Sequence, residues 1–200
     1  MNRTHIQYCT AFDGSRSIAS GKLVEVIKKV KENIDNGEAL SVLIFDDVSS
    51  ELVEVDFRGT MEDVLKRLGN PTAPENNQET TPRSPGRPRL GVIPREVTLL
   101  PRHWEWLNSQ PGGASVALRK LVEEARRMNS DRDQLRSSQG AVYRFMSAIA
   151  GDLPGFEEAA RALFAVHPEK FHEIVTTWPI DIRHHVQKLS GSVFTEEGGG

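Results

Sequence analysis

The stretch His5-Ile-Gln-Tyr-Cys-Thr-Ala-Phe-Asp-Gly-Ser-Arg-Ser-Ile-Ala19 determines how the fold begins. Two runs of strand-forming residues flank Asp13-Gly14, a dipeptide that supplies the positive φ angles of a tight hairpin turn. The segment that follows repeats apolar residues at the spacing of one helix face, and these are Leu23, Val26, Ile27, Val30 and Ile34. The sequence therefore predicts a β-hairpin followed by a helix.

A strand-strand-helix pattern comes next. Leu40–Phe45 is a short apolar run typical of a buried strand, and residues 53–57 alternate apolar and acidic side chains as a half-buried strand does. Thr60 and Asp63 have the spacing of a capping box at the start of a last short helix. The order ββαββα predicts a small α+β domain of β-grasp-like type over residues 1–69.

Residues 70–94 form a Pro-rich basic linker with no set of apolar side chains to bury. Within it, Gly86-Arg-Pro-Arg89 resembles the core of an AT-hook. Proline holds such a chain extended, glycine permits a close backbone approach, and the arginines can enter the narrow minor groove of A·T-rich DNA. This resemblance predicts that the linker binds DNA through Arg83, Gly86, Arg87, Pro88 and Arg89. The alternative is a plain linker that happens to be basic.

Residues 95–128 resemble a ribbon-helix-helix module. Glu96–Leu100 is predicted to be one strand, Pro101 is suited to the first position of a helix, and Gly113-Ala-Ser115 matches the usual entry to the second helix, with Ser115 as its cap. In that family the strand pairs with its twin across a two-fold axis, and the ribbon lies in the major groove of DNA. The resemblance implies a homodimer.

The DNA contacts that this resemblance implies are basic. Arg95 on the strand, and Arg119 and Lys120 on the second helix, would contact backbone phosphate, since the N-terminus of the second helix binds phosphate in that family. The strand departs from the family pattern because Val97 and Leu99 would also face the groove, where neither can hydrogen-bond to base edges.

The remaining segment, residues 129–200, is predicted to be helical. Apolar stripes recur over residues 142–149, 156–164, 171–178 and 182–189, with Gly and Pro between them. Short connections of this kind favour antiparallel packing in a helical bundle. The fold class expected for the whole chain is α+β.

Composition excludes several classes of protein. The 200 residues are 38% hydrophobic without a run long enough to cross a membrane, and the single Cys9 excludes a disulfide framework. We expect a cytoplasmic protein. The net charge of −3 conceals an asymmetry, because residues 82–127 carry a net charge of +5 and the rest carries −8. A local positive field attracts phosphate whatever the total charge.

Metal binding and catalysis find little support in the pattern. His184 and His185 are adjacent, so they point about 100° apart on a helix and do not chelate together. His172-Glu173 begins like a zinc-protease helix, but Thr176 occupies the place of the second histidine. We predict no metal, no cofactor and no catalytic residue.

For two further features, a structural role is a better explanation than a functional one. Asp46 and Asp47, at the end of an apolar strand, could bind magnesium, but such a pair more often starts a turn. Cys9 lies in a strand pattern, where an inert buried thiol is expected.

Four longer motifs together are similar to one bacterial family, domain-of-unknown-function family 2239, over nearly the whole chain. They are Tyr8-Cys-Thr-Ala-Phe-Asp-Gly14, Gly86-Arg-Pro-Arg-Leu-Gly-Val92, Arg95-Glu-Val-Thr-Leu-Leu-Pro-Arg-His-Trp-Glu-Trp106 and Gly140-Ala-Val-Tyr-Arg-Phe-Met146. The resemblance implies a bacterial cytoplasmic origin and carries over no activity or site residue.

The leading hypothesis is a DNA-associated regulatory protein that dimerises through residues 95–127 and binds double-stranded DNA. The runner-up is a protein–protein interaction adaptor without nucleic-acid binding. It is motivated by the overall acidic chain, by the apolar residues on the supposed reading strand, and by Trp104 and Trp106, a residue type favoured at interface hot spots. An enzyme is the third hypothesis.

Overall fold

The structure is a computed structural model that describes residues 7–39, 41–69, 93 and 95–194. Its contacts divide the chain into two units, residues 1–71 with 131–200, and residues 72–130. We call the first the sheet unit. We call the second the α3–α4 unit, because it contains α3 (Pro101–Ser109) and the beginning of α4 (Ala114–Ile149).

A three-stranded antiparallel sheet lies at the centre of the sheet unit. Its strands are β1 (Tyr8–Asp13), β2 (Arg16–Lys22) and β3 (Val42–Asp46), in the spatial order β2-β1-β3. The predicted hairpin between β1 and β2 is confirmed, and Gly14 supplies a φ of 58° at its turn. Strand β1 pairs with both neighbours, so it is buried along nearly its whole length.

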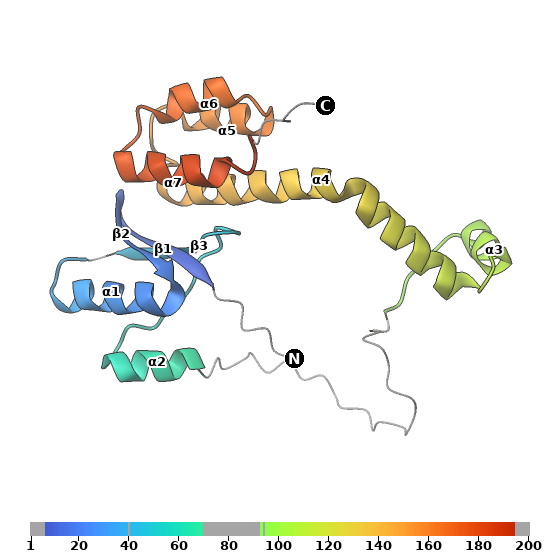
Figure 1. Cartoon of the computed structure of the whole chain (residues 1–200), viewed down its shortest axis with the longest axis horizontal. Helices are drawn as coiled ribbons and strands as arrows, with labels where there is room; N and C mark the ends of the chain where they lie inside the picture. The colour runs from blue at the N-terminus through green and yellow to red at the C-terminus, as the bar shows by residue number, and fades with distance from the viewer. Residues whose placement is uncertain (1–6, 40, 70–92, 94, 195–200) are drawn as a thin grey trace. The chain divides into compact units, whose positions relative to one another are not determined.

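The two faces of the sheet are covered by different helices (Figure 1). Alternate side chains of a strand point to opposite faces. Cys9 and Ala11 of β1 therefore pack with α1 (Leu23–Asp35) and α2 (Met61–Gly69), whereas Phe12 packs with the C-terminal helices. The sheet is thus the middle layer between two hydrophobic clusters.

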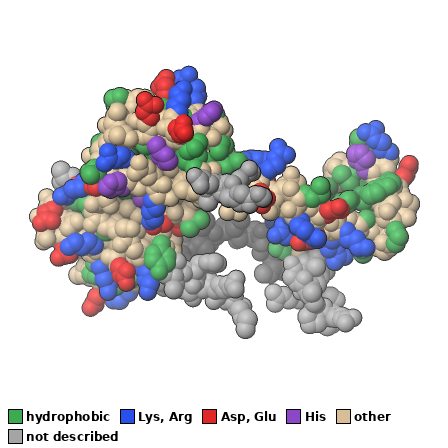
Figure 2. All heavy atoms as spheres, turned by 45° about the horizontal axis from the view of Figure 1, so that its top comes forward, with side chains coloured by type: hydrophobic (Ala, Val, Ile, Leu, Met, Phe, Trp, Pro, Cys, Tyr) green, Lys and Arg blue, Asp and Glu red, His purple; other side chains and the backbone are tan. Residues whose placement is uncertain are grey.

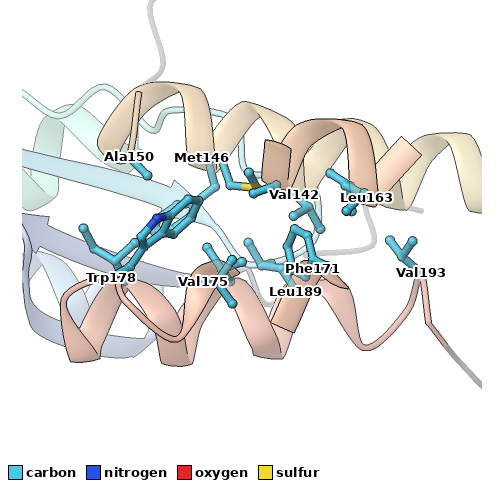
Figure 3. Close-up of a cluster of buried hydrophobic side chains, with 14 of the residues drawn as sticks. Val142, Met146, Ala150, Leu163, Phe171, Val175, Trp178, Leu189 and Val193 are labelled. Atoms are coloured by element: carbon cyan, nitrogen blue, oxygen red, sulfur yellow. The ribbon is translucent and has the colours of Figure 1, made fainter. Parts of the chain in front are cut away.

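The C-terminal helices build the larger cluster. They are the second half of α4, α5 (Phe156–Phe164), α6 (Pro168–Val175) and α7 (Ile180–Ser190). Figure 3 shows side chains from all four directed toward one another, among them Met146, Leu163, Phe171 and Leu189. Phe12 and Phe45 from the sheet join the same cluster. The predicted helices of this region are confirmed, and they share their core with the sheet.

The capping box is confirmed at the start of α2. The backbone N–H of Thr60 donates to Oδ2 of Asp63 over 3.0 Å, and the backbone N–H of Asp63 donates to Oγ1 of Thr60 over 3.3 Å. These reciprocal bonds satisfy two backbone donors that the first turn of a helix leaves without partners.

The predicted strand over residues 53–57 is wrong. The chain returns beside β3 only at Leu52, which forms an isolated bridge with Phe45. The inward side chains of the segment, Val53, Val55 and Phe57, still pack against the α1 cluster. The alternation in the sequence therefore reports which side chains face the core, and it does not require that the backbone pairs. The described order is ββαβα.

The strand predicted over residues 96–100 also requires correction. Residues 95–100 form no strand, because their backbone pairs with no neighbouring strand among the residues that the structure describes. Helix α4 runs over 36 residues, through the position at which the sequence analysis divides residues 95–128 from residues 129–200. No proline or glycine interrupts residues 114–139, so nothing in that stretch ends the helix.

The chain is therefore an α+β protein with a small sheet and more helix than strand. The division into residues 1–69, 70–94, 95–128 and 129–200 remains a prediction. None of the helices in the described part of the chain combines the length and the apolar character that crossing a membrane requires.

Candidate functional site

The residues predicted to bind DNA fall into two groups. Arg83, Gly86, Arg87, Pro88 and Arg89 lie outside the residues that the structure describes. Arg95, Arg119 and Lys120 are described, and all three are exposed. Arg119 and Lys120 are neighbours in the second turn of α4, where the Nε of Arg119 donates to the carbonyl of Ser115 over 3.0 Å. Arg95 precedes α3 in the chain.

Local geometry sets the entry to both helices of the α3–α4 unit. Pro101 occupies the first position of α3, as predicted, where its missing N–H leaves no helical bond unmade. Gly112 and Gly113 adopt φ angles of 87° and 76°, which only glycine takes readily, and so turn the chain into α4. Ser115 lies inside the first turn of α4 and not before it, so its predicted role as the cap is wrong.

The α3–α4 unit exposes its apolar side chains instead of burying them. Among its described residues only Leu107 and Ala117 are buried hydrophobic side chains. The exposed large hydrophobic residues of the same unit are Ile93, Val97, Leu100, Trp104, Trp106, Leu121, Val122 and Met128. Figure 2 shows hydrophobic side chains beside basic ones on the face of this unit that is in view. Such a surface is the usual mark of an interface.

A second polar site, which sequence analysis did not predict, lies between the sheet and α7. Oδ1 of Asp47 accepts a hydrogen bond of 2.7 Å from the Thr10 hydroxyl, and Oδ2 accepts one of 2.6 Å from Nζ of Lys188. The Thr10 hydroxyl is also 3.1 Å from that of Ser20. The Asp47 side chain is only 11% exposed, so these contacts replace its water.

His185 lies next to this ion pair and is buried. Its ring packs against Phe12 and Phe145, with centroid separations of 5.3 Å and 4.4 Å. Burial lowers the pKa of His185 to about 4, while the charge of Asp47 acts to raise that pKa and the charge of Lys188 to lower it, so the ring is neutral near neutral pH. Its Nε2 has no hydrogen-bond partner among the residues that the structure describes.

Asp46 has a structural role in the turn after β3. Its Oδ1 accepts hydrogen bonds from the backbone N–H groups of Val48 and Ser49, over 2.9 Å and 2.8 Å, and its Oδ2 accepts one from Gln7. Burial acts to raise the pKa of Asp46, but these hydrogen bonds together hold that pKa below its usual value. The interpretation of the acidic pair as the start of a turn agrees with these contacts.

Cys9 is fully buried on the α1 side of the sheet. Burial, followed by the charges of Asp46 and Asp47, raises the pKa of the thiol to about 11, so the thiol stays protonated near neutral pH. Within the described ranges, no three His, Cys, Asp or Glu side chains gather in a way that could hold a metal ion.

Comparison with protein-family models assigns the chain to one family. A family model described as "Uncharacterized protein conserved in bacteria (DUF2239)" matches residues 8–190. The chain belongs to this family. No curated protein and no solved structure matches the chain. The family resemblance inferred from the four sequence motifs is confirmed, and the match covers both the α3–α4 unit and the polar site beside α7.

Sequence reasoning missed the Thr10–Asp47–Lys188 site in this family member because its residues are far apart in the chain. Asp47 and Lys188 are separated by 141 positions. The available signals were a hydroxyl on an otherwise apolar central strand and a histidine on the apolar stripe of the last helix. Neither signal indicates which distant residue it contacts, because those contacts form only when α7 packs on the sheet.

Proposed function

We propose that this protein binds double-stranded DNA as a homodimer formed through residues 95–128. The observation that carries the proposal is the surface of the α3–α4 unit. Its described residues bury only two hydrophobic side chains and expose several large ones, and exposed basic residues lie at the start of α4. The proposed function is binding, without a catalytic step.

A second copy would supply the missing core. Two buried hydrophobic side chains are too few to hold the unit together, since burial of apolar surface is the main favourable term in folding. Leu100, at the entry to α3, has the extended backbone of a strand residue. In a two-fold dimer, residues 95–100 of two chains would pair with each other, and Trp104 and Leu121 would pack beneath that ribbon.

The basic residues supply the attraction to DNA. Residues 82–127 carry a net charge of +5, and phosphate contacts dominate the affinity of proteins for DNA. Arg119 and Lys120 lie near the N-terminus of α4, where the helix dipole also favours a phosphate. The predicted minor-groove contacts of Arg87 and Arg89 would add to these phosphate contacts.

The adaptor without nucleic-acid binding is the second candidate. One observation favours it, because Val97, which would face the major groove, is an exposed apolar side chain. Trp104 and Trp106 are exposed as well, and tryptophan is enriched at the centres of protein interfaces. In this case the apolar surface would bind a different protein.

A fluorescence-anisotropy titration with labelled A·T-rich and G·C-rich duplexes, each at two salt concentrations, tests the proposal. We expect salt-sensitive binding with a preference for the A·T-rich duplex. Replacing Arg119 and Lys120 with alanine should weaken binding to both duplexes. Each lost phosphate contact should reduce the slope of log K against log salt by about 0.9.

A matched control keeps the interpretation clear. Arg161→Ala removes one positive charge from the sheet unit, where Arg161 pairs with Glu158 over 2.9 Å, and should leave DNA binding unchanged. If the control weakens binding as much per charge removed as the paired Arg119 and Lys120 changes do, only total charge matters. Absence of binding to either duplex at low salt would overturn the proposal and leave the adaptor as the first candidate.

A further inference from the structure

An open cleft lies between the sheet and α7, within the sheet unit. Its volume is about 260 Å³, large enough for a molecule of monosaccharide size. The lining residues are Thr10, Phe12, Ser17, Ser20, Asp181, His184, His185 and Lys188. Most of them are polar and come from β1, β2 and α7, so three elements of the fold converge on this cleft.

His185 gives the first indication that the cleft holds a ligand. It lines the cleft and is 6% exposed, and its Nε2 lacks a hydrogen-bond partner in the described part of the chain. A buried nitrogen without a partner destabilises the folded state, and phenylalanine would fit among Phe12 and Phe145 without that penalty.

The charged side chains around the cleft indicate whether it can bind an anion or a cation. The ammonium of Lys188, which lines the cleft, is neutralised by Asp47 behind it at 2.6 Å, and Asp47 is not itself a lining residue. Asp181 receives the backbone N–H of Ser17 at Oδ2 over 3.0 Å, which holds its carboxylate at the wall of the cleft. Asp181, Lys188 and its partner Asp47 together carry a net charge of −1, and within the described residues the carboxylate of Asp181 has no ammonium partner of this kind, so the cleft favours a cation over an anion.

The hydroxyls define the rest of the ligand. Thr10, Ser17 and Ser20 line the cleft with groups that both donate and accept hydrogen bonds, which suits a hydroxylated molecule. We infer that this cleft binds a small hydroxylated amine, of the size and chemistry of an amino sugar, with its ammonium at Asp181 and a donor at His185. This inference stands independently of DNA binding.

Thermal unfolding of the full chain with D-glucosamine and with D-glucose tests the inference. The two sugars differ only in one amino group, so glucose is the matched neutral control. For a Kd of about 1 mM, glucosamine at about 10 mM should raise the Tm by about 3–6 °C, and glucose should raise it much less. The amide resonance of Ser17 should shift in ¹H–¹⁵N spectra with glucosamine only.

Two variants test whether the Tm shift arises from binding at this cleft. Asp181→Asn keeps an oxygen that accepts the Ser17 N–H but removes the charge, and His185→Phe keeps the shape of the ring but removes its nitrogens. Both should abolish the Tm shift that glucosamine causes. No shift in the wild type, an equal shift with glucose, or an undiminished shift in Asp181→Asn would each overturn the inference.

Discussion

Replacing His185 with phenylalanine should make the protein more stable. The ring already lies among aromatic side chains, and phenylalanine has nearly the same shape. A buried polar atom without a partner costs about 1–3 kcal/mol, so removing the unpartnered Nε2 should raise the free energy of unfolding by about 1–2 kcal/mol at pH 7. For a chain of this length that corresponds to a rise in Tm of about 2–8 °C.

The stabilisation should grow as the pH falls. Burial lowers the pKa of His185 from 6.5 to about 4, so between these values the unfolded chain binds a proton that the folded protein does not. Protonation then favours the unfolded state, and the wild type loses stability through this group as the pH falls from 6.5 toward 4. At pH 5 the loss is about 2 kcal/mol, and the phenylalanine variant does not suffer it.

Urea denaturation at pH 7 and pH 5 measures both effects, with the m-value reporting whether the compactness of either state has changed. His184→Phe is the control, because His184 is exposed and the same change there should shift stability by no more than about 0.5 kcal/mol. A His185→Phe variant that is less stable than the wild type, with a difference that does not depend on pH, would refute the reasoning.

Further substitutions should have distinct effects. Gly155→Ala should destabilise the protein by about 1–3 kcal/mol in thermal unfolding, because the residue has a φ of 78° and a Cβ there would lie 2.7 Å from a side-chain carbon of α6. Gly140→Ala, in open space on α4, should instead stabilise it by about 0.5–1 kcal/mol. Lys188→Met should destabilise the protein by about 1–2 kcal/mol in urea denaturation, because Asp47 is 11% exposed and loses its ammonium partner. Adding Asp47→Asn should recover part of the lost stability. Leu121→Asp should place a charge on the exposed apolar surface of α4 and give a monomer in size-exclusion chromatography, and an unchanged elution volume would argue against the proposed interface.

Features that depend on neighbours in the chain could be predicted from the sequence. The turn at Asp13-Gly14, the capping box of Thr60 and Asp63, and the helix start at Pro101 each follow from residues a few positions apart. The apolar stripes also indicated the buried faces of α1 and of the C-terminal helices correctly, whereas Leu121 and Val122 of α4 are exposed. The physical causes of these features are local, so a single sequence contains them.

Features that depend on distant partners could not be predicted. Residues 53–57 have the alternation of a strand, but pairing requires a neighbouring backbone at the right distance, and only Leu52 finds one. The proximity of Asp47 and Lys188 depends on how α7 packs on the sheet. The length of α4 was not predicted either, because residues 126–139 carry few apolar side chains to mark a helix face, although no glycine or proline ends the helix there.

Sedimentation velocity of the protein mixed with a fluorescently labelled A·T-rich duplex tests the central claim most directly, since it reports both association and stoichiometry. The account predicts that labelled DNA sediments in a complex containing two protein chains per duplex, and that Leu121→Asp removes this complex. Labelled DNA that sediments at its free rate with excess protein at low salt would contradict the account.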